Sequence, residues 1–157
     1  MQRIFVDTSF LLGLADASDP YHDGAVELRA ALKKGGYLVR DRDQLLTDLI
    51  LNEVTQQTLT QRGYAAARDL RRQLQNSATV IQTTGRELQQ AFDEICSRFG
   101  HHKHGSRGLS LVDGVTVVVM RRMRVGLLAS TDEGFDPVPA LRRVWCHNVD
   151  EICGPHP

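Results

Sequence analysis

Short β-prone runs and longer stretches of helically spaced apolar residues alternate along the chain. The β-prone runs predict strands at 3–6, within 37–48, at 79–83 and at 125–130. Between them, the apolar spacing predicts helices at 10–14, 19–34, 49–61, 64–76, 86–99 and 109–124. Such alternation is typical of a parallel sheet with helices on both faces. We therefore expect an α/β fold, a three-layer α/β/α sandwich whose central parallel sheet has about four to five strands.

Individual residues predict several boundaries and faces. We expect Asp19 to cap the helix at 19–34 and Gly63 to separate the two helices beside it. Within 109–124, Met120 is expected on the side away from the core. The stripe expected to face the core is Leu111, Val115, Val118, Val119 and Met123. After Asp132 the chain is Pro-rich, and irregular structure is predicted there.

The length of 157 residues and the apolar content of 41% fit one domain with a continuous core. We predict a single domain over 1–150 and a short C-terminal tail over 151–157. The beginning of the chain lacks a signal-peptide pattern, and no apolar run reaches the roughly 18 residues that a membrane span needs. Three cysteines without CxxC spacing favour a reducing, cytoplasmic setting.

Nineteen basic residues balance nineteen acidic ones, so local patches rather than bulk charge must bind any nucleic acid. Tyr64 with the arginines after it could stack on a base and contact phosphates, and the His-rich loop at 100–108 is a second candidate patch. A solvated helix face, a partly buried Tyr64 and a plain surface loop are the simpler interpretations. The candidate RNA-contacting residues are Arg68, Arg71, Arg72, Lys103 and Arg107.

The histidines of the loop at 100–108 also raise the question of a zinc site. His101, His102 and His104 lie near Cys96, but their spacing matches no standard zinc motif. A tetrahedral site would need a ligand from elsewhere in the chain. We therefore do not expect zinc here.

Four acidic residues stand where strands end or where the sequence is otherwise apolar. Asp7 follows the first predicted strand and Asp132 follows the fourth. In open parallel sheets, sites form outside the C-terminal ends of the strands. Glu53 and Asp113 lie near the starts of two predicted helices, in apolar surroundings. A buried ionised carboxylate is costly unless it is paired or binds a metal.

Four such acids with few cations nearby favour a divalent cation. Oxygen ligands suit Mg²⁺ or Mn²⁺ better than Zn²⁺, which prefers His and Cys. Such an ion activates water for phosphodiester hydrolysis, so no nucleophilic side chain is needed. Plainer interpretations remain for each acid: Asp7 as a helix cap, Asp113 as a first-turn residue, Asp132 as a turn residue and Glu53 as the partner of an arginine.

The acids lie in four motifs that together resemble the PIN-domain ribonucleases, and among them the VapC-like toxins of type II toxin–antitoxin systems. The motifs are IFVDTS at 4–9, LILNEV at 49–54, LSLVDG at 109–114 and LLASTDEGF at 127–135. Each motif alone is loose. Their order and spacing over most of the chain carry the resemblance.

The resemblance implies a Mg²⁺- or Mn²⁺-dependent endoribonuclease in which Asp7, Glu53, Asp113 and Asp132 are the catalytic, metal-binding acids. Among them we expect Asp7 and Asp113 to be the shared metal ligands and Asp132 to act through water. The resemblance also implies a homodimer and a small antitoxin protein lying across the active-site groove. Residues expected to support the acids are Thr8, Ser9 and Ser110, and a further carboxylate, Asp136, is expected to be solvated or to contact a metal-bound water.

Two other enzyme families fit the sequence less well. An RNase H-like nuclease would have several antiparallel strands after its first acid, whereas a helix pattern follows Asp7 directly. A haloacid dehalogenase-type phosphatase would have a second Asp where Ser9 stands. A solitary RNA-processing nuclease, or a catalytically silent PIN module that docks RNA or protein, is the remaining alternative.

Overall fold

The computed structural model describes residues 2–40, 42–101 and 108–154. The candidate residues Lys103 and Arg107, and the histidines His102 and His104, lie outside these ranges. The strands are β1 (Ile4–Val6), β2 (Gln44–Thr47), β3 (Thr79–Ile81), β4 (Leu127–Ala129) and β5 (Arg142–Val144). The α-helices are α1 (Thr8–Ala15), α2 (His22–Lys34), α3 (Asp48–Ser77), α4 (Gly85–Gln90), α5 (Ser97–Phe99), α6 (Leu111–Met123) and α7 (Asp150–Cys153). A π-helical segment, η1 (Ala91–Cys96), joins α4 to α5, and a 3-10 turn, η2 (Glu133–Phe135), follows β4.

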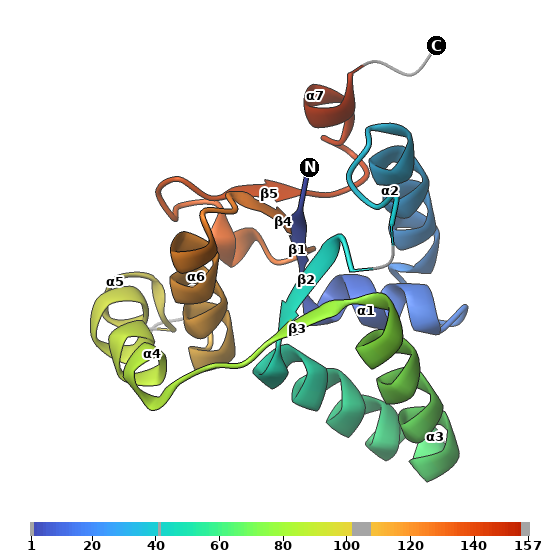
Figure 1. The fold of residues 1–157 in the computed structure, drawn as a ribbon, viewed down its shortest axis with the longest axis horizontal. Helices are drawn as coiled ribbons and strands as arrows, with labels where there is room; N and C mark the ends of the chain where they lie inside the picture. The colour runs from blue at the N-terminus through green and yellow to red at the C-terminus, as the bar shows by residue number, and fades with distance from the viewer. Residues whose placement is uncertain (1, 41, 102–107, 155–157) are drawn as a thin grey trace.

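All five strands run parallel, in the order β3-β2-β1-β4-β5 (Figure 1). The first strand of the sequence is therefore the central one. The chain builds outward from β1 through β2 to β3 and then crosses to β4 and β5, so the direction of strand order reverses beside β1. In open parallel sheets, the crevice at the carboxyl ends of the strands beside such a reversal is the usual place for a ligand.

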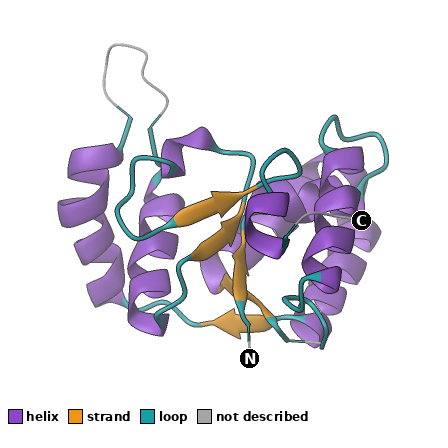
Figure 2. Cartoon of the chain, turned by 90° about the horizontal axis from the view of Figure 1, so that it is seen from above, coloured by secondary structure: helices purple, strands orange, loops and turns teal. Residues whose placement is uncertain are grey.

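Helices cover both faces of the sheet (Figure 2). One buried core joins the sheet to α1, α2 and α3, and a second joins it to η1 and α6. Side chains alternate along the central strand, with Ile4 and Val6 in the first core and Phe5 in the second. The predicted three-layer α/β/α sandwich is thus confirmed.

The break predicted at Gly63 is present within α3. Its φ of 83° and ψ of 176° lie in a region open only to glycine, and the chain is helical on both sides of it. The start of α2 was predicted wrongly, because the helix begins at His22 and not at residue 19. The Asp19 carboxylate instead accepts a hydrogen bond of 2.8 Å from the Tyr21 amide in the turn before the helix.

The end of the chain is more regular than predicted, because η2, β5 and α7 all follow Asp132.

The predicted burial of side chains was wrong on α6 and at Tyr64. Met120 is 2% exposed, since α6 lies between the sheet and η1 and is buried on two sides, whereas Leu111 at the first turn of α6 is 43% exposed. Tyr64, just beyond the bend at Gly63, is 72% exposed and not partly buried. Within the described ranges, no helix is both long and apolar enough to cross a membrane.

Candidate functional site

The carboxyl ends of the strands and the first turns of two helices meet beside β1. Asp7 follows β1 directly, and its amide donates a hydrogen bond of 3.0 Å to the Ala129 carbonyl oxygen at the end of β4. Asp132 lies in the turn after β4. Glu53 and Asp113 come from the beginnings of α3 and α6. The fold therefore delivers one acid from each of four separate elements to this edge of the sheet.

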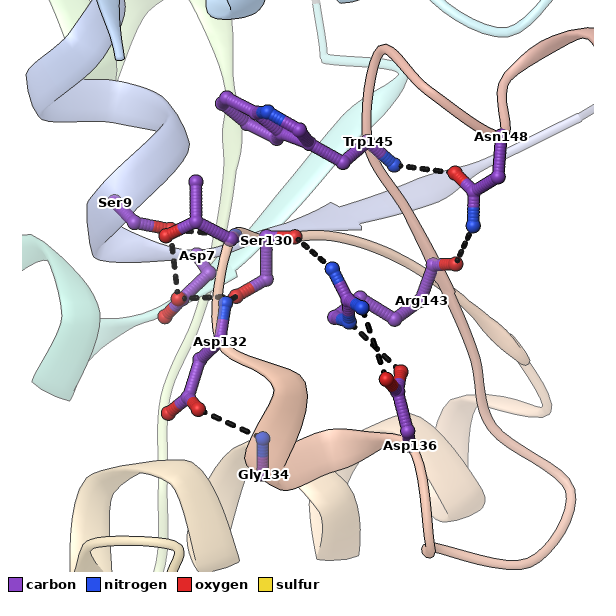
Figure 3. Close-up of polar contacts among 10 residues, drawn as sticks. Asp7, Ser9, Ser130, Asp132, Gly134, Asp136, Arg143, Trp145 and Asn148 are labelled. Carbon is purple, nitrogen blue, oxygen red and sulfur yellow. Dashed lines mark hydrogen bonds and ion pairs between the residues drawn. The ribbon is translucent and has the colours of Figure 1, made fainter. Parts of the chain in front are cut away.

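Asp7 is held by hydroxyl groups instead of capping a helix. It occupies the N-cap position of α1, but its side chain makes no capping hydrogen bond. Its Oδ2 atom accepts hydrogen bonds from the hydroxyls of Ser130 at 2.7 Å and Ser9 at 3.1 Å (Figure 3). Burial, followed by repulsion from Asp113, raises the pKa of Asp7 to about 6, although both hydroxyls act to lower it. The helix-cap interpretation of Asp7 is therefore wrong.

Asp113 is the acid whose charge interacts with each of the other three carboxylates. It forms a capping box with Ser110, accepting from the Ser110 amide at 2.8 Å while its own amide donates to the Ser110 hydroxyl at 3.2 Å. Burial raises the pKa of Asp113 first, and repulsion from Asp132 and Glu53 raises it further. Together with its repulsion of Asp7, these interactions place Asp113 within electrostatic reach of each of the other three acids.

Glu53 and Asp132 each have one local hydrogen-bond donor. The Thr8 hydroxyl donates to Oε2 of Glu53 at 2.5 Å, which joins the first turn of α1 to α3. Oδ1 of Asp132 accepts a hydrogen bond from the Gly134 amide at 2.8 Å. Through this oxygen, Asp132 acts as the turn residue of the plainer interpretation. The plainer interpretation of Glu53, a pairing with an arginine, is not supported by any ion pair among the described residues.

The donor set fits a hard divalent cation. Among the described residues, none of the four acids forms a direct ion pair with a lysine, arginine or histidine, and Arg143 acts on Asp132 only at longer range. In the same ranges, no three Asp, Glu, His or Cys side chains are already close enough to ligate one ion. A hydrated cation held through one or two carboxylates, as Mg²⁺ often is, suits this looser arrangement.

The residues predicted to support the acids take up distinct places. Thr8 and Ser9 donate to Glu53 and Asp7, and Ser110 contacts Asp113, as described above. Asp136 is 52% exposed, which agrees with the predicted solvated carboxylate, but it is also paired with an arginine. Its two oxygens accept hydrogen bonds from Nε of Arg143 at 2.7 Å and from Nη2 of the same residue at 2.9 Å. Asp136 therefore acts on the site only through Arg143.

The three described arginines proposed to contact RNA differ in their surroundings. Arg68 pairs with the neighbouring Asp69 on the exposed surface, whereas Arg72 is exposed with no such partner among the described residues. Arg71 donates from Nη1 to Asn52 and Thr55, both at 3.0 Å, and so ties the two halves of α3 together. Arg71 thus has a structural task besides any contact with RNA.

A family model for the PIN domain matches residues 4–141 of this sequence. The chain belongs to the PIN domain family. This confirms the resemblance drawn from the four motifs and supports a nuclease, a hydrolase of phosphodiester bonds, as the broad class of activity.

Two solved structures share the fold of this PIN domain. The first, VapC20 of Mycobacterium tuberculosis, described as a Sarcin-Ricin loop cleaving toxin, has a TM-score of 0.71 and 23% identity, and the match covers 90% of this chain and 98% of that one. The second, PAE2754 of Pyrobaculum aerophilum, has a TM-score of 0.56 and 17% identity over 91% of this chain and 90% of that one. No curated protein gives a significant match by sequence.

Sequence reasoning missed two residues of the PIN domain's acidic site. Ser130 is fully buried and bonds Asp7 directly, and its signal was a hydroxyl residue at the end of an apolar strand, as Ser9 is after the first strand. Arg143 gave no comparable signal, because an arginine pair in a Pro-rich segment is typical of exposed surface. Only the pairing of β5 with β4 brings Arg143 inside.

Proposed function

We propose that this PIN domain is an endoribonuclease dependent on Mg²⁺ or Mn²⁺, with Asp7, Glu53, Asp113 and Asp132 holding the cation. One observation supports this most: Asp113 lies within electrostatic reach of three acids from three other elements, and no described cationic side chain pairs directly with any of the four. A divalent cation supplies the missing charge and, in phosphodiester hydrolysis, activates water and offsets the charge of the phosphate.

The chain's own residues would orient the acids. Ser9 and Ser130 both bond Oδ2 of Asp7, so Oδ1 receives neither hydroxyl. Thr8 and Ser110 fix Glu53 and Asp113 in the same way. Hydrolysis transfers a hydroxyl group from water to phosphorus and a proton to the leaving sugar oxygen. No side chain becomes attached to the substrate, which agrees with a site built from carboxylates alone.

The proposal extends to a toxin that pairs with a small antitoxin protein and forms a homodimer. The likeness to VapC20 supports this reading over that of a solitary RNA-processing nuclease. The neighbouring gene distinguishes the two. A toxin predicts a short upstream reading frame for a DNA-binding antitoxin, and co-expression with that protein should silence cleavage. A gene that stands alone would favour the solitary nuclease.

Cleavage assays with purified protein test the proposed activity. Single-stranded RNA and a sarcin–ricin loop oligonucleotide are incubated with Mg²⁺, with Mn²⁺ and with EDTA. We expect internal cleavage that EDTA abolishes and that Asp7→Asn and Asp113→Asn reduce by about 100-fold or more. Asp23→Asn removes an exposed acid of α2 and is the control, with activity unchanged. Cleavage that survives both EDTA and Asp7→Asn would overturn the mechanism.

RNA binding without cleavage would instead support the silent docking module. Calorimetry separates this outcome from a failed choice of substrate. A nuclease that lacks its proper RNA still binds Mn²⁺ and loses that binding in Asp7→Asn, whereas a docking module shows no metal binding that depends on the acids.

A further inference from the structure

Arg143 on β5 is the only lysine or arginine that is buried among the described residues. A buried guanidinium is costly unless its donors are satisfied. Its Nε and Nη2 bond both oxygens of Asp136, and its Nη1 donates to the Ser130 carbonyl oxygen at 3.3 Å (Figure 3). The hydrogen bond with Asp136 raises the pKa of Arg143, with smaller contributions from Glu133 and Asp132, so the side chain stays charged.

These contacts hold both ends of the segment that carries Asp132. Ser130 stands at one end and donates its hydroxyl to Asp7, while the Asp132 amide donates to the same hydroxyl oxygen at 3.0 Å. Asp136 stands at the other end, directly after η2. One guanidinium therefore closes residues 130–136 into a loop, with Asp132 inside it.

Arg143 is itself anchored to the edge of the sheet. Its carbonyl oxygen accepts from Nδ2 of Asn148 at 3.1 Å, and Oδ1 of Asn148 accepts from the Trp145 amide at 2.7 Å. The Ser130 amide in turn donates to the Val144 carbonyl oxygen at 3.3 Å. A continuous series of hydrogen bonds thus runs from Asn148 through Arg143 and Ser130 to Asp7.

We infer that Arg143 is a positioning residue of the acidic site: it fixes the loop 130–136 so that Ser130 and Asp132 keep their places beside Asp7. This inference rests on the proposed function. The guanidinium of Arg143 bonds Asp136 and Ser130, and none of the four acids. It acts through Ser130 and Asp136, and its removal should impair the site even where the fold survives.

The direction in which Arg143→Met changes the affinity for Mn²⁺ separates a positioning role from a purely electrostatic one. Arg143 carries a positive charge beside an acidic cluster. Its charge alone therefore repels a metal cation and weakens the binding of Mn²⁺. If charge were its only effect, Arg143→Met would bind Mn²⁺ more tightly than the wild type. If Arg143 positions the loop, the same variant binds Mn²⁺ more weakly although the site has become more negative.

The experiment measures Mn²⁺ binding by calorimetry in the absence of RNA, together with kcat and KM for RNA cleavage. We expect Arg143→Met to weaken Mn²⁺ binding by about 10-fold, the usual size of effect for residues that orient metal ligands, and to lower kcat more than KM. Arg143→Lys keeps the charge without the planar fork and should recover part of the loss. Arg142→Met is the matched control, because Arg142 is exposed on the same strand and pairs with Glu151.

Each result decides the matter. Wild-type protein that binds no Mn²⁺ overturns the proposed function, and the inference with it. If the wild type binds Mn²⁺ and Arg143→Met binds it equally or more tightly, the inference is overturned and the proposed function stands. Should Arg143→Met fail to fold, Asp136→Asn replaces it, since the Asp136 side chain is half exposed. The side-chain amide introduced by this substitution can no longer accept hydrogen bonds from both Nε and Nη2 of Arg143. Weaker Mn²⁺ binding in Asp136→Asn supports positioning, and unchanged binding contradicts it.

Discussion

The Ser130 hydroxyl donates a hydrogen bond of 2.7 Å to Oδ2 of Asp7 across a separation of 123 residues in sequence. The same hydroxyl oxygen accepts from the Asp132 amide at 3.0 Å. One buried serine therefore joins the first and the last of the four acids. It also supplies a hydrogen bond that opposes the effect of burial on the pKa of Asp7.

Removing this hydroxyl should weaken both the fold and the site. We expect Ser130→Ala to lower the free energy of unfolding of the metal-free protein by about 1.5–3 kcal/mol at neutral pH, because a charged acceptor loses a buried donor. Denaturant unfolding in EDTA measures this. The control is Ser18→Ala, which removes an exposed hydroxyl bonded to Asp16 and should change stability by less than about 0.5 kcal/mol. Equal effects of the two variants would contradict the assigned role.

The pKa of Asp7 predicts an unusual dependence of stability on pH. Its pKa is raised from 3.8 to about 6, so between these values the folded protein binds more protons than the unfolded chain. The free energy of unfolding of the metal-free protein should therefore fall as pH rises from about 4 to about 6, by about 3 kcal/mol from Asp7 alone.

The variant Asp7→Asn isolates this contribution. Unfolding is followed in EDTA at several pH values from about 4 to about 7.5. The wild type should lose more stability than Asp7→Asn as pH rises, and the difference between the two should level off above the pKa of Asp7. Parallel pH profiles for the two proteins would show that Asp7 has an ordinary pKa.

The bend in α3 predicts a position that accepts only glycine. Gly63 has a φ of 83°, and a Cβ atom built there meets no other atom within 4 Å, so a substitution would suffer from backbone strain and not from a clash. We expect Gly63→Ala to cost about 1–3 kcal/mol of stability. Gly85→Ala is the control, because Gly85 has equal space, no positive φ and a helical position. Loss of stability only in Gly85→Ala would reverse this reading.

The exposed Arg72 tests the predicted RNA contact with little risk to the fold. If Arg72 contacts a phosphate, Arg72→Ala should weaken RNA binding and reduce the slope of log affinity against log salt concentration by about 1. Arg29→Ala on α2 removes another exposed charge and should leave the slope unchanged. Fluorescence anisotropy with labelled RNA at several salt concentrations measures both slopes. Identical slopes in wild type and Arg72→Ala would remove Arg72 from the RNA interface.

Much of the fold could be predicted because periodic apolar patterns reflect local physics. The central strands and their helices are apolar on the faces that they bury, so Ile4, Phe5 and Val6 already indicate a strand packed on both sides. The strand β5 was missed because its buried Arg143 depends on Asp136 and Ser130, contacts that no local pattern encodes. Asp19 misled for the opposite reason, since the same residue type suits a helix cap and a turn.

The candidate site was predictable in its acids and less so in its supports. Acids in apolar sequence stand out, because burial of a charge calls for a partner. The supporting roles of Ser9 and Thr8 were implied by the resemblance to the PIN family. Ser130 is as close to Asp7 as either of them, yet a serine at the end of an apolar strand is common, and only the parallel pairing of β1 with β4 makes it a partner of Asp7.

The place of β1 at the centre of the sheet also affects how the protein is made. Asp7 leaves the ribosome well before its neighbour strand β4 and its partner Ser130, which emerge only after α6 has been synthesised. Contacts so distant in sequence form late in folding. An incomplete chain that ends within α6 after Asp113 contains Asp7, Glu53 and Asp113 but neither Ser130 nor Asp132. The acidic site is therefore complete only after β4 and Asp132 have been synthesised, so a chain truncated within α6 lacks part of the acidic site.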